Sequence, residues 1–284
     1  MINGKNIILT GLNLSEWNTL TDILTIYELE LRYCSELNWF PSISCLQVLS
    51  IESVPIRSIP TLLFCTKMNL VTCSELTHID IQPKLKSVYI TSCPLLTDIS
   101  GLVSCNRVQL SECPGVRDYL PICNCRELTL TDVNLMNYQW LDSFFRPSFS
   151  LVLATMFIPS AIGILPAFSY INELTFRNIS LVSMSLPCHN IMNLSCFILK
   201  EIHDCVNIQR LTILDCHELI KVHDFCNIGK LKVYGFPKLV SWGKLMKVGH
   251  IKIWESRPLE SALKEYELSP MSLSNITDVI KINY

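Results

Sequence analysis

The sequence is poor in charge and in glycine. Charged residues make up 17% of its 284 positions, and the formal net charge is −2. A chain with this balance lacks the basic surface that general binding to nucleic acid or to a membrane surface requires. We therefore expect neither as a partner. The chain has only nine glycines, which disfavours a glycine-rich fold that cradles phosphate groups.

The usual catalytic motifs are also missing. The sequence contains no P-loop, no dinucleotide fingerprint, no HExxH and no GxSxG motif. Paired carboxylates such as Glu28 and Glu30 fall on a surface predicted to be open, where nothing would desolvate them and raise their pKa for acid catalysis. We expect a protein that is not an enzyme, with no catalytic residues, no cofactor and no bound metal.

The first residues show no secretory signal. The stretch MINGKNIILTGLNLSEW has one lysine and an apolar run of three residues, so it lacks the hydrophobic region of a signal peptide. Fourteen cysteines would suit a disulfide scaffold in a short secreted chain, but this chain is long. We expect reduced thiols in the cytoplasm, with the nucleus as the second choice. A receptor-type, ligand-binding segment held by disulfides is an alternative.

Hydrophobic residues make up 49% of the chain, and many stand in pairs of the form apolar–x–apolar that recur about every 20 residues. The first residues of these pairs are Leu29, Leu49, Met68, Val88, Val108, Leu128, Leu151, Leu174, Met192, Leu211, Leu231 and Ile251. A weaker copy begins at Ile7. The position five residues after the first is Cys34, Cys73, Cys93, Cys113 or Cys216 in five copies, and another apolar residue in most others. We call this position the ladder position.

Alternation within each pair predicts a short β-strand with one buried face. One strand per 20 residues, always in the same phase, does not fit a series of hairpins. The strands must stack in parallel, each joined to the next by a crossover of loop or 3₁₀ turn. The sequence therefore predicts a repeat solenoid with one short parallel strand per turn and little helix.

The order x–x–L–x–x–L–x–L–x–x–C–x–x–L resembles the leucine-rich repeat, and it recurs in phase from about Ile7 to Leu259. The resemblance implies an arc with an exposed strand face. The ladder position differs from the family, which often has Asn there and sometimes Cys. A Cys at this position mainly fills space and offers only a weak S–H donor.

The phase of the repeat suggests one solenoid over residues 1–259, with about 12–13 turns. It is irregular at 137–172, where two intervals lengthen to 23 residues. Residues 260–284 leave the pattern and would form a C-terminal cap or tail, since solenoid ends need a cover. The segment 147–172 has no charged residue before Glu173, which makes a membrane span the weaker alternative there. Pro159 and Pro166 argue against a spanning helix.

The same alternation turns other strand residues outward, side by side on neighbouring turns. The predicted partner-binding residues are Tyr89, Arg107, Gln109, Arg210, Lys230, Lys232, Tyr234, Lys252 and Trp254. The last five of these mix cations with large aromatics, which suits an acidic protein partner. The alternative is ordinary solvated charge, with Trp254 covered by the tail. The sequence thus favours a non-catalytic, monomeric scaffold for protein–protein interaction.

A second hypothesis is a zinc- or cysteine-dependent enzyme that uses the region from Cys205 to Cys226. This region holds Cys205, Cys216, His217, His223 and Cys226. Thiolate and imidazole are zinc ligands. However, no C-x-x-C pair occurs, and Cys216 falls at the ladder position. Packing is the favoured role for these cysteines, because buried Cys behaves as a small hydrophobic residue.

Overall fold

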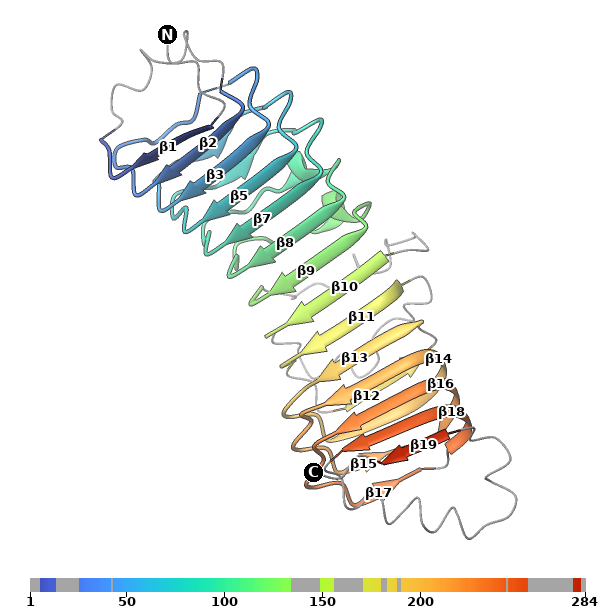
Figure 1. Ribbon diagram of the computed structural model, residues 1–284. Helices are drawn as coiled ribbons and strands as arrows, with labels where there is room; N and C mark the ends of the chain where they lie inside the picture. Colours follow the sequence, from blue (N-terminus) through green and yellow to red (C-terminus); the bar gives the residue numbers. More distant parts are fainter. Residues whose placement is uncertain are drawn as a thin grey trace, which may run out of the picture. The chain divides into compact units, whose positions relative to one another are not determined.

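The computed structural model describes residues 6–13, 26–41, 43–133, 149–155, 171–179, 183–187, 190–243, 245–254 and 278–281. The chain forms two compact units, residues 1–145 (the N-terminal unit) and residues 146–284 (the C-terminal unit). In each unit, parallel strands about one 20-residue turn apart lie side by side (Figure 1). The predicted repeat solenoid of parallel strands is confirmed.

The N-terminal unit contains one continuous ladder of parallel strands. These are β1 (Asn6–Thr10), β2 (Glu28–Arg32), β3 (Val48–Glu52), β5 (Lys67–Val71), β7 (Ser87–Thr91), β8 (Arg107–Ser111) and β9 (Glu127–Thr131). The register places equivalent residues next to each other, so Val88 pairs with Val108, and Val108 with Leu128. The crossovers contain the short pair β4 (Ser58–Ile59) and β6 (His78–Ile79). Two 3₁₀ turns follow, η3 (Ser100–Leu102) and η4 (Leu120–Ile122).

The C-terminal unit has two rows of parallel strands, one that carries the apolar pairs and a second one in the crossovers. The strands of the whole unit are β10 (Phe149–Ala154), β11 (Ile171–Arg177), β12 (Ser183–Pro187), β13 (Ile191–Ser195), β14 (Glu201–Leu214), β15 (Lys221–Val222), β16 (Phe225–Tyr234), β17 (Ser241–Trp242), β18 (Leu245–Trp254) and β19 (Asp278–Lys281). The first half of β14 pairs with β12 and β15, whereas its second half pairs with β13 and β16. We call the row β12, β14, β15 and β17 the second ladder.

The buried residues are those that the alternation predicts. On β7, Val88 and Ile90 are buried while Tyr89 between them is exposed. One turn departs from the pattern. Phe197, at the expected ladder position, is 46% exposed, and Cys196 is buried in its place. The other turns, such as the one with Asp215, insert a left-handed residue after the strand. The turn at Cys196 has no such residue, so its buried position comes one residue earlier.

That left-handed residue forms a corner after the strand in both units. The corner residues are Gly11, Tyr33, Ser53, Thr72, Ser92, Glu112, Asp132, Thr155, Asn178, Asp215 and Gly235. Their φ values lie between 48° and 73°, a region that disfavours residues with a Cβ. Most corners nevertheless carry a side chain, so the stacking of neighbouring turns must outweigh this local strain.

The ladder cysteines donate weak hydrogen bonds to the backbone of their own turns. The Sγ of Cys113 donates to the carbonyl of Ser111 at 3.2 Å, and the Sγ of Cys216 donates to that of Leu214 at 3.4 Å. Cys34, Cys73 and Cys93 repeat this contact to the carbonyl two residues earlier. None of the described cysteines forms a disulfide. The thiols therefore pack the core and weakly satisfy one carbonyl per turn.

A buried amide replaces the apolar pattern in one crossover. The side chain of Gln82 is fully buried, and its Nε2 donates to the carbonyls of Pro60 (2.9 Å) and Asp80 (2.8 Å). Its Oε1 accepts from the backbone N–H of Leu62 at 3.1 Å. Gly101 lies in the next turn, where an added Cβ would fall 2.2 Å from the carbonyl oxygen of Asp80. Here hydrogen bonds from a buried side chain to backbone groups link neighbouring turns, in place of apolar packing.

Most of the irregular segment 137–172 and of the tail 260–284 lies outside the described residues. From the tail, β19 pairs in parallel with β18, with Asp278 opposite His250. No helix among the described residues is long and apolar enough to cross a membrane.

Candidate interaction surface

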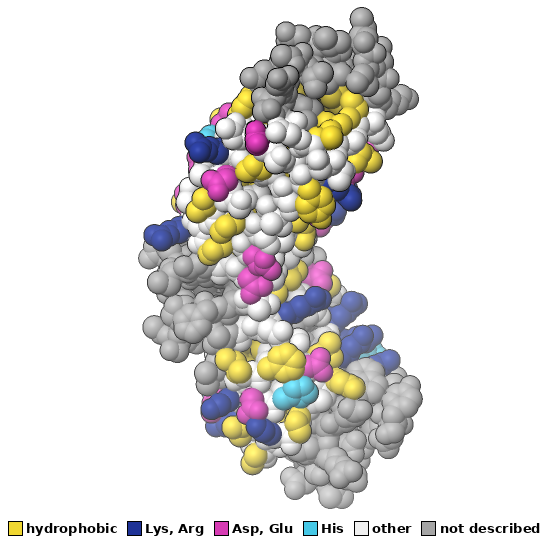
Figure 2. Space-filling model, turned by 90° about the vertical axis from the view of Figure 1, so that its left-hand side faces the viewer, with side chains coloured by type: hydrophobic (Ala, Val, Ile, Leu, Met, Phe, Trp, Pro, Cys, Tyr) yellow, Lys and Arg dark blue, Asp and Glu magenta, His cyan; other side chains and the backbone are white. Residues whose placement is uncertain are grey.

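The predicted partner-binding residues whose side chains the structure describes are exposed or half-buried in both units. They lie on the strands that carry the apolar pairs. On β2, β5 and β9, for example, the residues between and around the buried pair are exposed or half-buried. Figure 2 shows Lys and Arg side chains gathered along one side of the C-terminal unit. The arrangement of charge differs between the two units, so we describe the two faces in turn.

The C-terminal face brings its predicted residues into register across β14, β16 and β18. Arg210, Lys230 and His250 form one row, and Lys232 pairs with Lys252 in the next. We call these two rows the basic rows. Tyr234 pairs with Trp254 in a third row, and the side chain of Trp254 lies outside the described part of the structure. Neighbouring strands lie only about 4.8 Å apart, so five of the predicted residues, with His250, share one small area of the sheet.

The lysines of the basic rows stand beside other basic residues in the register: Lys230 lies between Arg210 and His250, and Lys232 pairs with Lys252. Among the side chains that the structure describes, no Asp or Glu forms an ion pair with Lys230, Lys232 or Lys252. Like charges directly opposite on neighbouring strands destabilise a sheet. All three side chains are half-buried, with stems that can lie on the sheet while the ammonium groups stay in water. The lysines of the basic rows therefore oppose folding slightly, and no carboxylate among the described side chains forms an ion pair with them.

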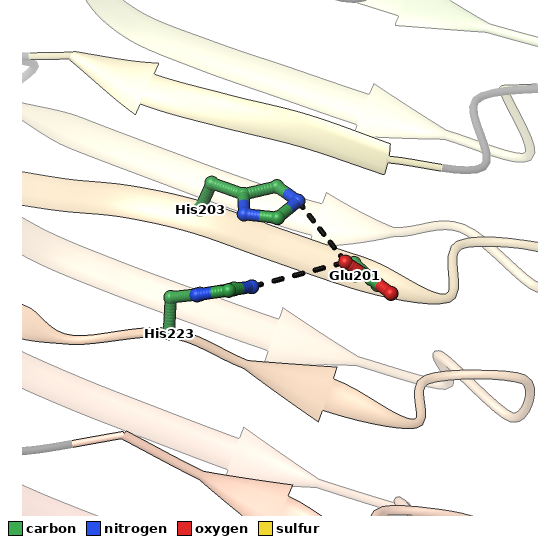
Figure 3. A group of neighbouring side chains, drawn as sticks. All are labelled: Glu201, His203 and His223. Carbon is green, nitrogen blue, oxygen red and sulfur yellow. Dashed lines mark ion pairs between the residues drawn. The ribbon is translucent and has the colours of Figure 1, made fainter.

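The structure does not gather the cysteines and histidines of the second hypothesis into one group. Cys205 and Cys216 are buried in the core, and the ring of His217 lies 5.3 Å from that of Phe197. Burial raises the pKa of the Cys216 thiol to about 12, which disfavours the thiolate that a nucleophile or a zinc ligand requires. His223 instead lies beside Glu201 and His203 on the second ladder (Figure 3).

Sequence reasoning missed the neighbourhood of Glu201, His203 and His223, although a signal was present. His203 and His223 are separated by one 20-residue turn, so a solenoid places them at equivalent positions of neighbouring turns. The possible ligand atoms of these three side chains lie within 4.8 Å of one another. Among the described residues, this is the group of three His, Cys, Asp or Glu side chains that lies close enough to hold a metal ion.

The N-terminal face gathers three predicted partner-binding residues around a shallow hollow of about 410 Å³. Tyr89 and Gln109 are direct neighbours in register on β7 and β8, and Arg107 lies at the start of β8. The hollow is also lined by Lys67, Met68, Asn69, Ser87 and Val88. Arg107 is already engaged, since its Nε and Nη2 donate to both carboxylate oxygens of Glu127 at 2.5 and 2.8 Å. This contact lowers the pKa of Glu127.

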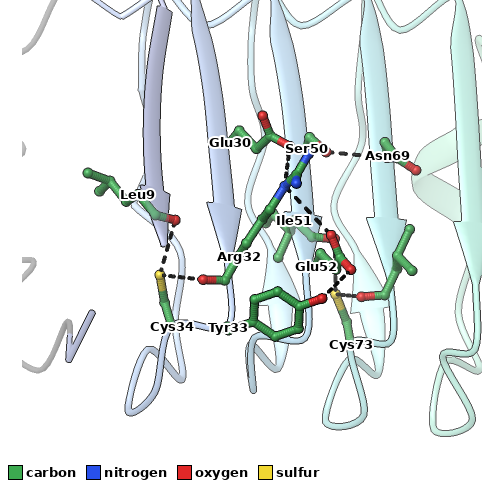
Figure 4. A network of polar contacts seen from close by, with 11 residues as sticks. Leu9, Glu30, Arg32, Tyr33, Cys34, Ser50, Ile51, Glu52, Asn69 and Cys73 are labelled. Atoms are coloured by element: carbon green, nitrogen blue, oxygen red, sulfur yellow. Dashed lines mark hydrogen bonds and ion pairs between the residues drawn. The ribbon is translucent and has the colours of Figure 1, made fainter. Parts of the chain in front are cut away.

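A second charged group on this face is paired in the same way (Figure 4). The guanidinium of Arg32 forms an ion pair with Glu30 on its own strand and another with Glu52 at 3.6 Å on the next. The hydroxyl of Tyr33 donates to Glu52 at 2.9 Å, which raises the pKa of Tyr33. Both arginines on the strands of this face, Arg32 and Arg107, are therefore paired with carboxylates within the protein.

The parallel register and the spacing of the strands define each unit as a parallel β-solenoid with an open strand face. No protein-family model matches this chain, and no curated protein matches it either.

Proposed function

We propose that this chain is a non-catalytic scaffold, of the leucine-rich-repeat type, that binds an acidic segment of another protein on the basic rows. The observation that carries the proposal is the stack of lysines in register that has no described carboxylate partner. Charges that destabilise the fold are retained most simply because they serve binding. Tyr234 beside the lysines is exposed and adds the kind of side chain that concentrates binding energy in interfaces.

The spacing of the lysines suits an extended acidic partner. Lys230 and Lys232 are two residues apart on β16, or about 6.6 Å along the strand. Alternate carboxylates of an extended peptide have the same spacing, so such a segment would place successive charges on successive lysines. A stacked sheet also keeps its surface rigid, which lowers the ordering cost of association.

The proposal extends, as a smaller contact region, to the N-terminal hollow with Tyr89, Arg107 and Gln109. It also places the protein in the cytoplasm as a monomer, where its thiols would stay reduced. The basic rows remain the central claim, because no carboxylate among the described side chains forms an ion pair with Lys230, Lys232 or Lys252.

The test is a double charge reversal, Lys232→Glu with Lys252→Glu. We expect the variant to keep its strand content and to bind a fluorescent oligoglutamate peptide at least ten times more weakly than the parent, measured by anisotropy at low salt. Binding by the parent should weaken as salt rises, because exposed charges are screened. The matched control is Lys200→Glu with Lys247→Glu, which makes the same charge change off the basic rows. Equal binding by the two double variants contradicts the proposal.

A further inference from the structure

Glu201, His203 and His223 occupy the outward side of the second ladder in the C-terminal unit. Glu201 and His203 flank the buried Ile202 at the start of β14, so both side chains point away from the core. Ile202 pairs with Val222 on β15, which places His223 one turn beyond His203. The three side chains therefore meet through the pairing of two turns, on a row of strands distinct from the basic rows.

The two imidazoles converge on one carboxylate (Figure 3). The Oε2 of Glu201 lies 3.3 Å from Nε2 of His203 and 3.8 Å from Nε2 of His223. The two rings stack with centroids 4.0 Å apart and an angle of 33° between their planes. Their side chains are 30% and 34% exposed, and that of Glu201 is 43% exposed. The cluster is thus half-sheltered but reachable by an ion from solution.

One nitrogen in the cluster lacks a hydrogen bond. The Nε2 of His223 is buried and has no hydrogen-bond partner among the described atoms, since 3.8 Å to Glu201 is too long for one. A buried polar atom left in this way costs about 1–3 kcal/mol. Two protonated imidazoles stacked this closely would also repel each other. A single divalent cation between the two nitrogens and the carboxylate removes both problems.

The neighbouring turns lack these ligands. Ser183 pairs with Glu201 in the turn before, and Ser241 pairs with Lys221 in the turn after. Gly243 follows β17 as His223 follows β15. The fold therefore accepts small residues at these positions, and histidine in two successive turns is not a requirement of stacking.

We propose that Glu201, His203 and His223 bind a divalent transition metal ion of the zinc class. Two imidazole nitrogens and one carboxylate oxygen form a ligand set that suits zinc. A tetrahedral zinc with bonds of 2.0–2.1 Å holds its ligand atoms roughly 3.3 Å apart. The two nitrogens lie 3.3 and 3.8 Å from the carboxylate oxygen, and all three ligand atoms lie within 4.8 Å of one another, so side-chain rotations can bring them to this spacing. Three protein ligands leave a fourth position for water or for a group of a partner.

The experiment uses the full chain, stripped with a chelator and dialysed, and titrates it with Zn²⁺ in a calorimeter. We expect one ion per chain. His203→Gln, His223→Gln and Glu201→Gln should each weaken binding at least about tenfold, because even residues behind the ligands contribute 10–100-fold. The matched control is His217→Gln in the same unit, which should bind like the parent. Circular dichroism checks that each variant is folded.

Co²⁺ and histidine NMR identify the ligands directly. Bound Co²⁺ should show the visible bands of nitrogen and oxygen ligation without a thiolate charge-transfer band, and Zn²⁺ should shift the ring ¹⁵N signals of His203 and His223 but not of His217. Failure to bind an equivalent of metal overturns the proposal, as does a thiolate band or binding that survives all three ligand variants. The variant with Lys232→Glu and Lys252→Glu should keep its metal, so this proposal and the scaffold proposal fail separately.

Discussion

The strand faces of the two units share a backbone plan but treat charge in opposite ways. In the N-terminal unit, Arg107 meets Glu127 across neighbouring strands, and Arg32 meets Glu30 and Glu52. In the C-terminal unit, Lys230 pairs with His250 at the position that corresponds to Arg107 and Glu127, and Lys232 pairs with Lys252 two residues further along. A paired charge satisfies its neighbour within the fold, whereas a stacked like charge is satisfied only by something outside it.

The comparison also shows that residues that build the core alternate along each strand with residues that carry the surface charge. The buried residues follow the same rule in both units, as Val108 and Leu110 on β8 and Leu231 and Val233 on β16 illustrate. The outward residues between them vary without disturbing that core. A difference in function between the units can therefore arise entirely from every second residue of a strand.

The largest expected effect tests this separation on adjacent residues of β8. Leu110→Asp places an unpaired charge in a fully buried position, and we expect it to lower the free energy of unfolding by about 4 kcal/mol or more. Gln109→Asp, one residue earlier and outward, should change it by less than about 0.5 kcal/mol. Urea denaturation, with hydrogen exchange of β7 to β9, measures both. Similar losses from the two substitutions would break the division into core and surface residues.

The sequence predicted the repeat, the parallel stacking and the direction of the strand side chains, because each depends on local alternation repeated in phase. Lys232 and Lys252 could be placed together from their 20-residue spacing alone. The absence of an ion pair between these lysines and a described carboxylate could not be predicted, since ion pairing depends on side-chain positions across three strands. The ion pair between Arg107 and Glu127 could not be predicted for the same reason, although these residues also stand one turn apart.

Other features depended on details that a 20-residue spacing does not define. The exchange of Phe197 for Cys196 follows from one missing corner residue, which shifts the buried position without breaking the anchor pattern. Gln82 is buried because its amide forms hydrogen bonds with three backbone groups of a crossover, and the repeat pattern does not indicate these contacts. The cluster at Glu201 requires the second ladder, which begins inside what the repeat assigns to a crossover.

A medium effect is expected at the corners, where a glycine and a β-branched residue adopt the same left-handed conformation. Gly235 in the C-terminal unit has φ +73° and room for a Cβ, whose nearest contact would be 3.9 Å away. Gly235→Ala should therefore cost about 1–2 kcal/mol from backbone strain alone. The N-terminal Thr72 is β-branched at φ +54°, so Thr72→Gly should be neutral or stabilising by up to about 1 kcal/mol. Thermal unfolding of both variants measures the contrast, and stabilisation by Gly235→Ala would contradict it.

The smallest expected effect reverses the charge contrast itself. Lys252→Glu faces Lys232 and should raise the free energy of unfolding by about 0.2–1 kcal/mol, while Glu127→Lys faces Arg107 and should lower it by a similar amount. Both sites are partly exposed, so screening keeps these values small. Thermal unfolding at low salt measures them, and the two changes should shrink together as salt is added. Shifts of the same sign would show that the faces do not differ as the structure indicates.

Lowering the pH should weaken the ion pair between Arg107 and Glu127 on the N-terminal face. The hydrogen bond from Arg107 lowers the pKa of Glu127 in the folded protein, so the stability from this pair is present above the unfolded pKa of about 4.3. It is lost as the pH falls through the lower, folded value. Acidification from pH 7 to about 3 should therefore lower the melting temperature of the parent more than that of Arg107→Gln, in which the Glu127 carboxylate has no cation to retain. The Lys252→Glu variant should lose its added stability over the same range, because its gain depends on an ionised carboxylate.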